Sequence, residues 1–187
     1  MKKEKDWKLV QKEPAIDLNI LNIEYHHYQN PRNNKVVKTI AIRGNDAVNV
    51  IALTKDKKVL LVRQFRFGIG NYTIELPGGM VDEGESNKVA AQRELREETG
   101  FAGINWQKLG TIYSNPVFMN SKITHFMVES AYSQYPLDLD DAEDVEILTL
   151  SIQEVYDWID KEKIQHPHTI SAFYFARNLL RKRTEKF

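Results

Sequence analysis

Short apolar runs separated by polar turns dominate the first 150 positions of the chain. Runs of this kind, bounded by Gly, Pro, Asn and Asp, predict β-strands rather than helices. The predicted strands cover residues 7–11, 17–29, 35–43, 47–53, 59–65, 72–76, 106–113, 123–129 and 145–150. Residues 59–65 are apolar at most positions, which is typical of a strand in the middle of a sheet.

Three segments carry helix signals instead. The first begins near Ser86, a good N-cap residue, and stops at Gly100, a residue type common just beyond a helix end. The second begins at a capping box formed by Ser151 and Glu154, and the third begins near Pro167. Together with the strands, these helices predict an α/β (α+β) domain built on a mixed sheet.

Composition and charge narrow the class of protein. The 187 residues include 26 basic and 26 acidic side chains, so the chain lacks the basic excess of nucleic-acid or membrane-surface binders. Without cysteine, a metal would need oxygen or histidine ligands. No apolar run resembles a signal peptide or a transmembrane helix. We therefore expect a cytoplasmic enzyme that binds neither nucleic acid nor a membrane.

Three carboxylates crowd one face of the first predicted helix. Glu94, Glu97 and Glu98 stand at i, i+3 and i+4, and each like-charge pair at this spacing costs about 0.2–0.5 kcal/mol. Arg93 compensates for only part of this repulsion, through its i, i+4 pair with Glu97. Two interpretations follow from the triplet alone: a solvated acidic face, or a site for a hard divalent cation such as Mg²⁺ or Mn²⁺.

The spacing around the triplet favours the second interpretation. The order is Gly79, five residues, Glu85, seven residues, Arg93-Glu94-Leu95, one residue, Glu97-Glu98, one residue, Gly100-Phe101. It matches the Nudix box, GX5EX7REUXEEXGU with U apolar, at every specified position. A chance match somewhere in the chain has odds on the order of 10⁻⁷ at average residue usage. The chain therefore resembles a Nudix hydrolase, whose fold is a mixed sheet between helices.

The resemblance implies a metal-dependent hydrolase that uses Mg²⁺, with Mn²⁺ as a substitute. The implied metal ligands are Glu94, Glu98, Glu97 as ligand or support, and the backbone carbonyl of Gly78. Arg93 is expected to orient Glu97 within the catalytic group. Glu85 has two open roles, as a ligand or as a structural hydrogen-bond acceptor.

Features outside the box resemble the ADP-ribose pyrophosphatase and nucleotide-sugar branch of the family, over roughly residues 45–182. They include Val-Arg-Gln-Phe-Arg at 62–66, Glu-Leu-Pro-Gly-Gly at 75–79 and Pro116, sixteen positions after Gly100. This resemblance implies a nucleoside diphosphate sugar as substrate, ADP-ribose first, with GDP-mannose or a dinucleotide as alternatives. A non-catalytic Nudix module that binds a nucleotide is the alternative from another class.

The same resemblance assigns roles to several residues. In the acidic segment 141–146, Glu143 is the first choice for general base and Glu146 the second. Arg66 is expected to hold a phosphate, because a guanidinium makes bidentate contacts with oxyanions. Glu75 either pairs with an arginine or contacts the nucleotide.

The loop at 114–122 and the N-terminal strands supply the remaining expectations. The loop departs from the branch pattern, since neither a glycine nor a carboxylate follows Pro116, and this leaves the terminal sugar open. Phe118 either lines a substrate pocket there or anchors the loop. Residues 1–44 resemble a β extension that forms homodimers, ahead of a hydrolase domain at 45–187. Tyr28, like Tyr25 or Trp7, either stacks on a base across that interface or packs in the hairpin core.

Overall fold

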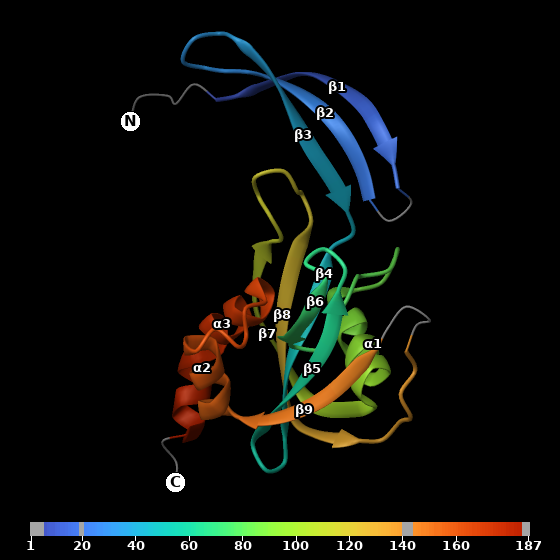
Figure 1. Ribbon diagram of the computed structural model, residues 1–187, viewed down its shortest axis with the longest axis vertical. Coiled ribbons are helices and arrows are strands. Elements are labelled where there is room, and N and C mark those ends of the chain that lie inside the picture. Colours follow the sequence, from blue (N-terminus) through green and yellow to red (C-terminus); the bar gives the residue numbers. More distant parts are fainter. Residues whose placement is uncertain (1–5, 19–20, 140–143, 185–187) are drawn as a thin grey trace. The chain divides into compact units, whose positions relative to one another are not determined.

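The computed structural model describes residues 6–18, 21–139 and 144–184 (Figure 1). The chain divides into two compact units. The smaller unit comprises Met1–Asn45 with Tyr113–Lys122, and the larger comprises Asp46–Ile112 with Ile123–Phe187. No helix among the described residues is long and apolar enough to cross a membrane.

The smaller unit is built on a three-stranded antiparallel sheet of β1 (Lys8–Asp17), β2 (Leu21–Gln29) and β3 (Val36–Gly44). The hairpin predicted around residues 30–34 joins β2 to β3, and Asn34 adopts the positive φ of 59° that such a turn needs. β1 continues six residues beyond the predicted end, despite Pro14. A proline is tolerated here because β1 is an edge strand and its register shifts between Pro14 and Ile16.

The larger unit is built on a mixed six-stranded sheet in the order β6-β5-β4-β8-β7, with β9 also paired to β5. The strands are β4 (Ala47–Thr54), β5 (Lys58–Arg66), β6 (Asn71–Glu75), β7 (Phe101–Tyr113), β8 (Lys122–Ser133) and β9 (Val145–Ser151). β4 and β8 run parallel, whereas β5 is antiparallel to β4, β6 and β9. The prediction that residues 59–65 form a central strand is therefore confirmed.

Helices cover both faces of this sheet (Figure 1). Leu60 packs in a cluster with residues of α1 (Asn87–Thr99), among them Leu95. The next residue, Leu61, packs on the other face against residues of α2 (Ile152–Asp160) and α3 (Pro167–Thr184), including Phe173. Because successive side chains of a strand point to opposite faces, β5 contributes side chains to the hydrophobic clusters on both faces of the sheet. The predicted mixed sheet between helices is confirmed.

The predicted helix boundaries follow from local capping. The Ser86 hydroxyl accepts a hydrogen bond from the Val89 amide at the start of α1. Gly100 ends α1 in the left-handed conformation, with φ at 70°. At α2, Ser151 and Glu154 form the expected reciprocal capping box. These caps fix where the carboxylate-bearing helix α1 begins and ends, and hence which of its side chains face the site.

Candidate functional site

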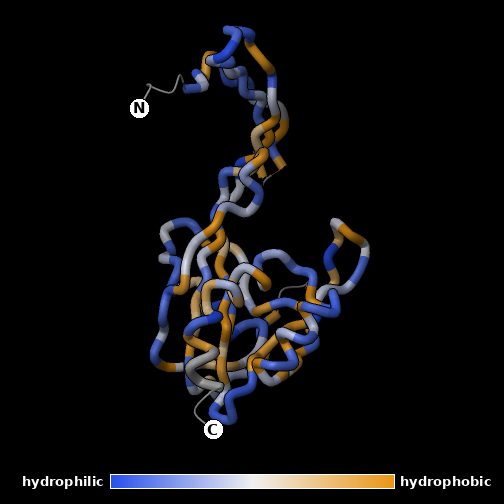
Figure 2. Tube along the Cα trace, turned by 90° about the vertical axis from the view of Figure 1, so that its left-hand side faces the viewer, coloured by the Kyte–Doolittle hydropathy of each residue, from blue (hydrophilic) through white to orange (hydrophobic). Residues whose placement is uncertain are grey.

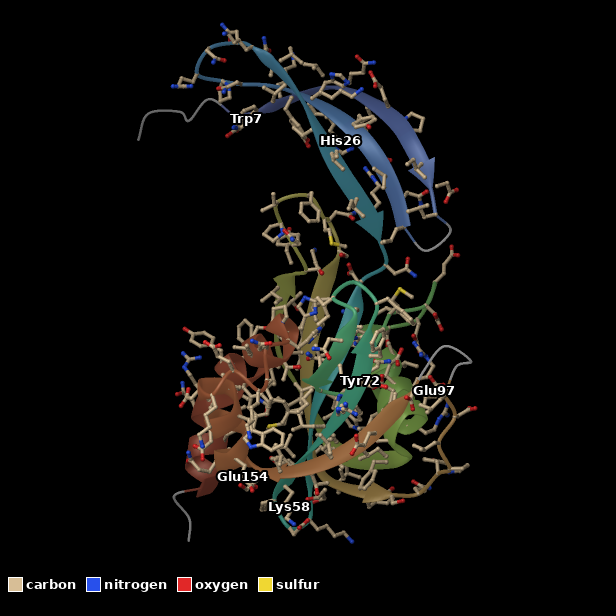
Figure 3. The ribbon with its side chains drawn as sticks, viewed as in Figure 1. Trp7, His26, Lys58, Tyr72, Glu97 and Glu154 are labelled. Carbon is tan, nitrogen blue, oxygen red and sulfur yellow. The ribbon has the colours of Figure 1, made fainter. Side chains whose placement is uncertain are left out.

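A cavity of about 270 Å³ lies in the larger unit, beside α1 and the glycine turn that precedes it. The predicted site residues that line it are Arg66, Gly78, Arg93, Glu94, Glu97 and Glu98. They come from β5, from the turn after β6 and from α1. In Figure 3 the labelled Glu97 marks the part of α1 that faces this carboxylate-rich lining. Residues far apart in the sequence thus contribute to one concave, polar site.

The glycine turn lies directly against two buried carboxylates. Glu94 and Glu98 are only 8% and 2% exposed, and the Gly78 amide donates a 2.8 Å hydrogen bond to Glu98 Oε2. A Cβ atom added at Gly79 would lie 2.6 Å from Glu94 Oε1. Only glycine permits so close an approach, so this position of the box keeps room for the Glu94 carboxylate.

Arg93 is the counter-charge of the cluster. Its Nη1 donates to Glu94 Oε1 at 2.8 Å and to Glu97 Oε2 at 3.1 Å. Its Nε and Nη2 donate to the two carboxylate oxygens of Glu85, at 3.2 and 3.0 Å, and Nη2 also reaches the Met80 carbonyl. The hydrogen bond from Arg93 lowers the pKa of Glu85, and the same bond is the largest cause of a raised pKa at Arg93. Glu85 is thus placed as an acceptor for Arg93.

The chemistry of this donor set fits a hard divalent cation, because it consists of carboxylate and peptide oxygens. In the described part of the chain, however, no three Asp, Glu or His side chains converge closely enough to hold a metal. Arg93 holds Glu94 and Glu97, while the Gly78 amide holds Glu98. A carboxylate has about four acceptor positions, so these hydrogen bonds orient the three groups without by themselves excluding a cation.

Arg66 is fixed at the cavity by a buried carboxylate. Its Nε and Nη2 donate to Glu75 Oε1 and Oε2 at 2.7 and 2.6 Å, and Glu75 is only 2% exposed. Burial, the largest single cause, would raise the pKa of Glu75, but the Arg66 hydrogen bonds, the charges of His166 and Arg66 and the Thr73 hydrogen bond together lower it. His166 Nε2 lies 3.4 Å from Glu75 Oε2, and burial lowers the pKa of His166 to about 4. Of the two predicted roles for Glu75, the structure places it in the arginine pair.

Of the two predicted general bases, Glu146 is among the described residues and does not line the cavity. Glu146, on β9, forms a 3.2 Å ion pair with Arg63 on β5. Arg63 also stacks 3.9 Å from the ring centroid of Tyr72, which Figure 3 labels on β6. Glu143 lies outside the described residues.

The other predicted substrate-binding residues belong to the smaller unit. Tyr28 sits on β2 between Leu9 and Val37 and is half-buried. Pro116 opens the turn at residues 116–118 and is exposed. The Phe118 side chain is 40% exposed, and its carbonyl accepts a hydrogen bond from the Ile42 amide. That bond ties the loop to β3 through the backbone, whereas the exposed Phe118 side chain is not a buried anchor.

The cavity lining also includes four residues that are not among the predicted site residues: Gln64, Met80, Asp82 and Asp138. Gln64 precedes Arg66 by two positions on β5, so both side chains lie on the same face of the strand. The spacing of two positions from Arg66 within a strand is the sequence signal that identifies Gln64 as a cavity residue. Asp138 carries no comparable signal, because it follows β8 in a stretch without regular structure.

Comparisons with known proteins agree with this geometry. The NUDIX domain model matches residues 44–179. The ADP-ribose pyrophosphatase of Bacillus subtilis is 25% identical over 171 residues, covering 91% of this chain and 92% of that protein. An uncharacterised Nudix hydrolase of Schizosaccharomyces pombe is 34% identical over 139 residues, 68% of each chain. A solved structure titled as an ADP compounds hydrolase shares the fold, with a TM-score of 0.83 and 21% identity over 95% of both chains. The family model thus spans the six-stranded sheet, the cavity, α1, α2 and most of α3, and includes only the last residue of the N-terminal sheet. The chain belongs to the Nudix family.

Proposed function

We propose that this protein hydrolyses the diphosphate linkage of nucleoside diphosphate sugars, ADP-ribose first, to a nucleoside monophosphate and a sugar phosphate. One observation carries the proposal: the buried Glu94 and Glu98 face the same cavity as the guanidinium of Arg66. Carboxylates that hold a cation and an arginine that holds an oxyanion are what a diphosphate substrate needs. The relatives named for ADP-ribose or ADP-sugar hydrolysis support this choice of substrate.

Glu94, Glu98 and Glu97 would hold the cation, Mg²⁺ or Mn²⁺ in its place, with the Gly78 carbonyl as a further ligand. When bound, the cation polarises phosphoryl oxygens and lowers the pKa of a bound water. Arg66, held on one edge by Glu75, would orient a phosphate. Arg93 would keep Glu97 and Glu94 in place, rather than contact substrate.

The reaction also needs a group that takes a proton from the attacking water. Water adds to one phosphorus, the bridging P–O bond breaks, and the leaving phosphate carries away the electron pair. Because Glu146 is engaged by Arg63, we favour Glu143 for this role over Glu146.

Phosphate release with a coupled phosphatase tests the proposal. The panel comprises ADP-ribose, GDP-mannose, ADP-glucose, dinucleotides and nucleoside triphosphates, each with Mg²⁺ and with Mn²⁺. We expect ADP-ribose to be turned over with the highest kcat/KM. A preference for GDP-mannose or a dinucleotide would support diphosphate hydrolysis but contradict the choice of ADP-ribose. The 115–122 loop would then be the segment to mutate. Nucleotide binding without turnover of any compound would instead support the non-catalytic module.

We further propose that the N-terminal extension, residues 1–44, forms a homodimer. Ile16, Val36 and Ile40 are each more than half exposed, and the strand register puts them on one face of the smaller sheet. Figure 2 shows hydrophobic residues recurring along these strands. An exposed apolar face of this kind is typical of a surface that associates.

Light scattering on the purified protein tests this proposal. We expect twice the monomer mass, and a monomer for Ile40→Lys, which places a charge on that face. Thr39→Lys, on the other face of the same strand, is the matched charge control and should remain dimeric if apolar contact drives association. A monomeric wild type across micromolar concentrations contradicts the proposal.

A further inference from the structure

The side chain of Gln64 combines burial with an unused acceptor. Gln64 is 8% exposed, and its Oε1 atom has no hydrogen-bond partner among the described residues. Buried polar atoms are almost always paired, because leaving one unpaired forfeits its hydration. An unpaired buried acceptor in the wall of a cavity therefore asks for an explanation in terms of a ligand.

The surroundings of Gln64 limit what that ligand group can be. On β5 it is paired with Thr73 of β6 and Val145 of β9, so its backbone is held on both sides. Gln64 is among the residues that line the cavity, with Arg66, Glu94 and Glu98, although its Oε1 atom is itself shielded from solvent. Those three groups suit phosphate oxygens and a cation, both of which lack a proton to donate. A neutral acceptor among them is suited to an O–H donor and adds no charge that would repel a diphosphate.

We propose that Gln64 turns its side-chain amide toward the cavity and there accepts, through Oε1, a hydrogen bond from a bound O–H group, either a sugar hydroxyl of the substrate or a water on the divalent cation. This inference rests on the proposed function and adds a specificity determinant to it. A site that leaves a buried acceptor unpaired discriminates strongly against ligands that lack the matching donor. Gln64 would thus select hydroxyl-bearing or correctly hydrated ligands over bare phosphates.

The first test is the stability of the metal-free protein without ligand. Gln64→Met keeps the length of the side chain and removes the acceptor. We expect its Tm to rise by about 2–4 °C, because the unpaired oxygen no longer has to be buried. Gln107→Met, at an exposed position on β7, is the matched control and should leave Tm unchanged. Gln64→Leu serves as a second variant, should methionine prevent folding.

The second test measures binding by calorimetry and separates the two sources of the O–H group. If the donor is a cation-bound water, Gln64→Met should weaken binding of Mn²⁺ alone by about 5- to 10-fold. If the donor is a sugar hydroxyl, it should weaken α,β-methylene ADP-ribose in Mg²⁺ by the same factor. In that case methylenediphosphonate, which has no sugar, should bind both proteins equally.

Unchanged affinity for all three probes would overturn the inference, whatever happens to Tm. None of these measurements requires turnover, so an inactive wild type would count against the proposed function and leave the Gln64 test intact. Conversely, an active wild type with unaltered binding in Gln64→Met would refute only the role of Gln64.

Discussion

Replacing Glu98 with glutamine should lower kcat by about 10³-fold while leaving the fold intact. Glu98 is 2% exposed and accepts a hydrogen bond from the Gly78 amide. Its carboxylate therefore has a fixed position at the cavity. Glutamine keeps the shape and an acceptor oxygen for that amide but loses the charge that a cation needs. A cation contributes several kcal/mol of transition-state stabilisation, and each 1.4 kcal/mol is about tenfold in rate.

Steady-state kinetics with ADP-ribose over a range of Mg²⁺ concentrations measures this loss, with Tm as the check on folding. Glu83→Gln is the matched control, because Glu83 is exposed in the loop that precedes α1 and does not line the cavity. It should retain wild-type kcat. Wild-type activity in Glu98→Gln would remove Glu98 from the proposed metal ligands.

Replacing Arg93 with methionine should destabilise the protein by about 3–5 kcal/mol, the usual cost of removing one partner from a largely buried ion pair. The Arg93 side chain is 23% exposed and carries hydrogen bonds to Glu85, Glu94 and Glu97. Without it, these three carboxylates repel one another in a partly desolvated site. Activity should fall as well, since Glu94 and Glu97 lose their common anchor.

Urea unfolding of the metal-free protein gives this free energy directly. Arg96→Met provides the comparison: the Arg96 side chain is 45% exposed and forms an ion pair with Glu97, so its replacement should cost under about 1 kcal/mol. Arg93→Lys keeps the charge but not the planar fork, so its stability should lie between the two. Equal stability of the Arg93→Met and Arg96→Met proteins would show that Arg93 is not the centre of the cluster.

The fold could be predicted largely from local signals. The helix caps act within one turn of their helices, so a short stretch of sequence is enough to predict them. They are Ser86, Gly100 and the Ser151–Glu154 box. The start of β7 was placed five residues late, because Gly103 and Asn105 have low strand propensity. The sheet overrides that preference, as it does at Pro14 in β1. The predicted and observed strands therefore differ where pairing with the next strand along the chain overrides local propensity.

The site was predictable to the extent that its residues share one segment. The box spacing pointed to the α1 carboxylates, whose catalytic roles remain predictions. The pairing of Arg66 with Glu75 depends on the register between β5 and β6, which no local pattern reveals. The same holds for the buried, unpaired oxygen of Gln64. Long-range pairing thus determines which polar side chains the cavity collects.

The parallel pairing of β4 with β8 bears on how the protein folds. Ala47 lies opposite Ile123, and all of α1 and β5–β7 separates them in the chain. Contacts between such distant segments require the loop-closure entropy to be overcome before they stabilise anything, which slows folding. On the ribosome, one edge of β4 stays unpaired until β8 has been synthesised. Until then the apolar strand Ala47–Thr54 lacks the neighbour that completes the sheet, and this interval is when the nascent chain is most prone to aggregate.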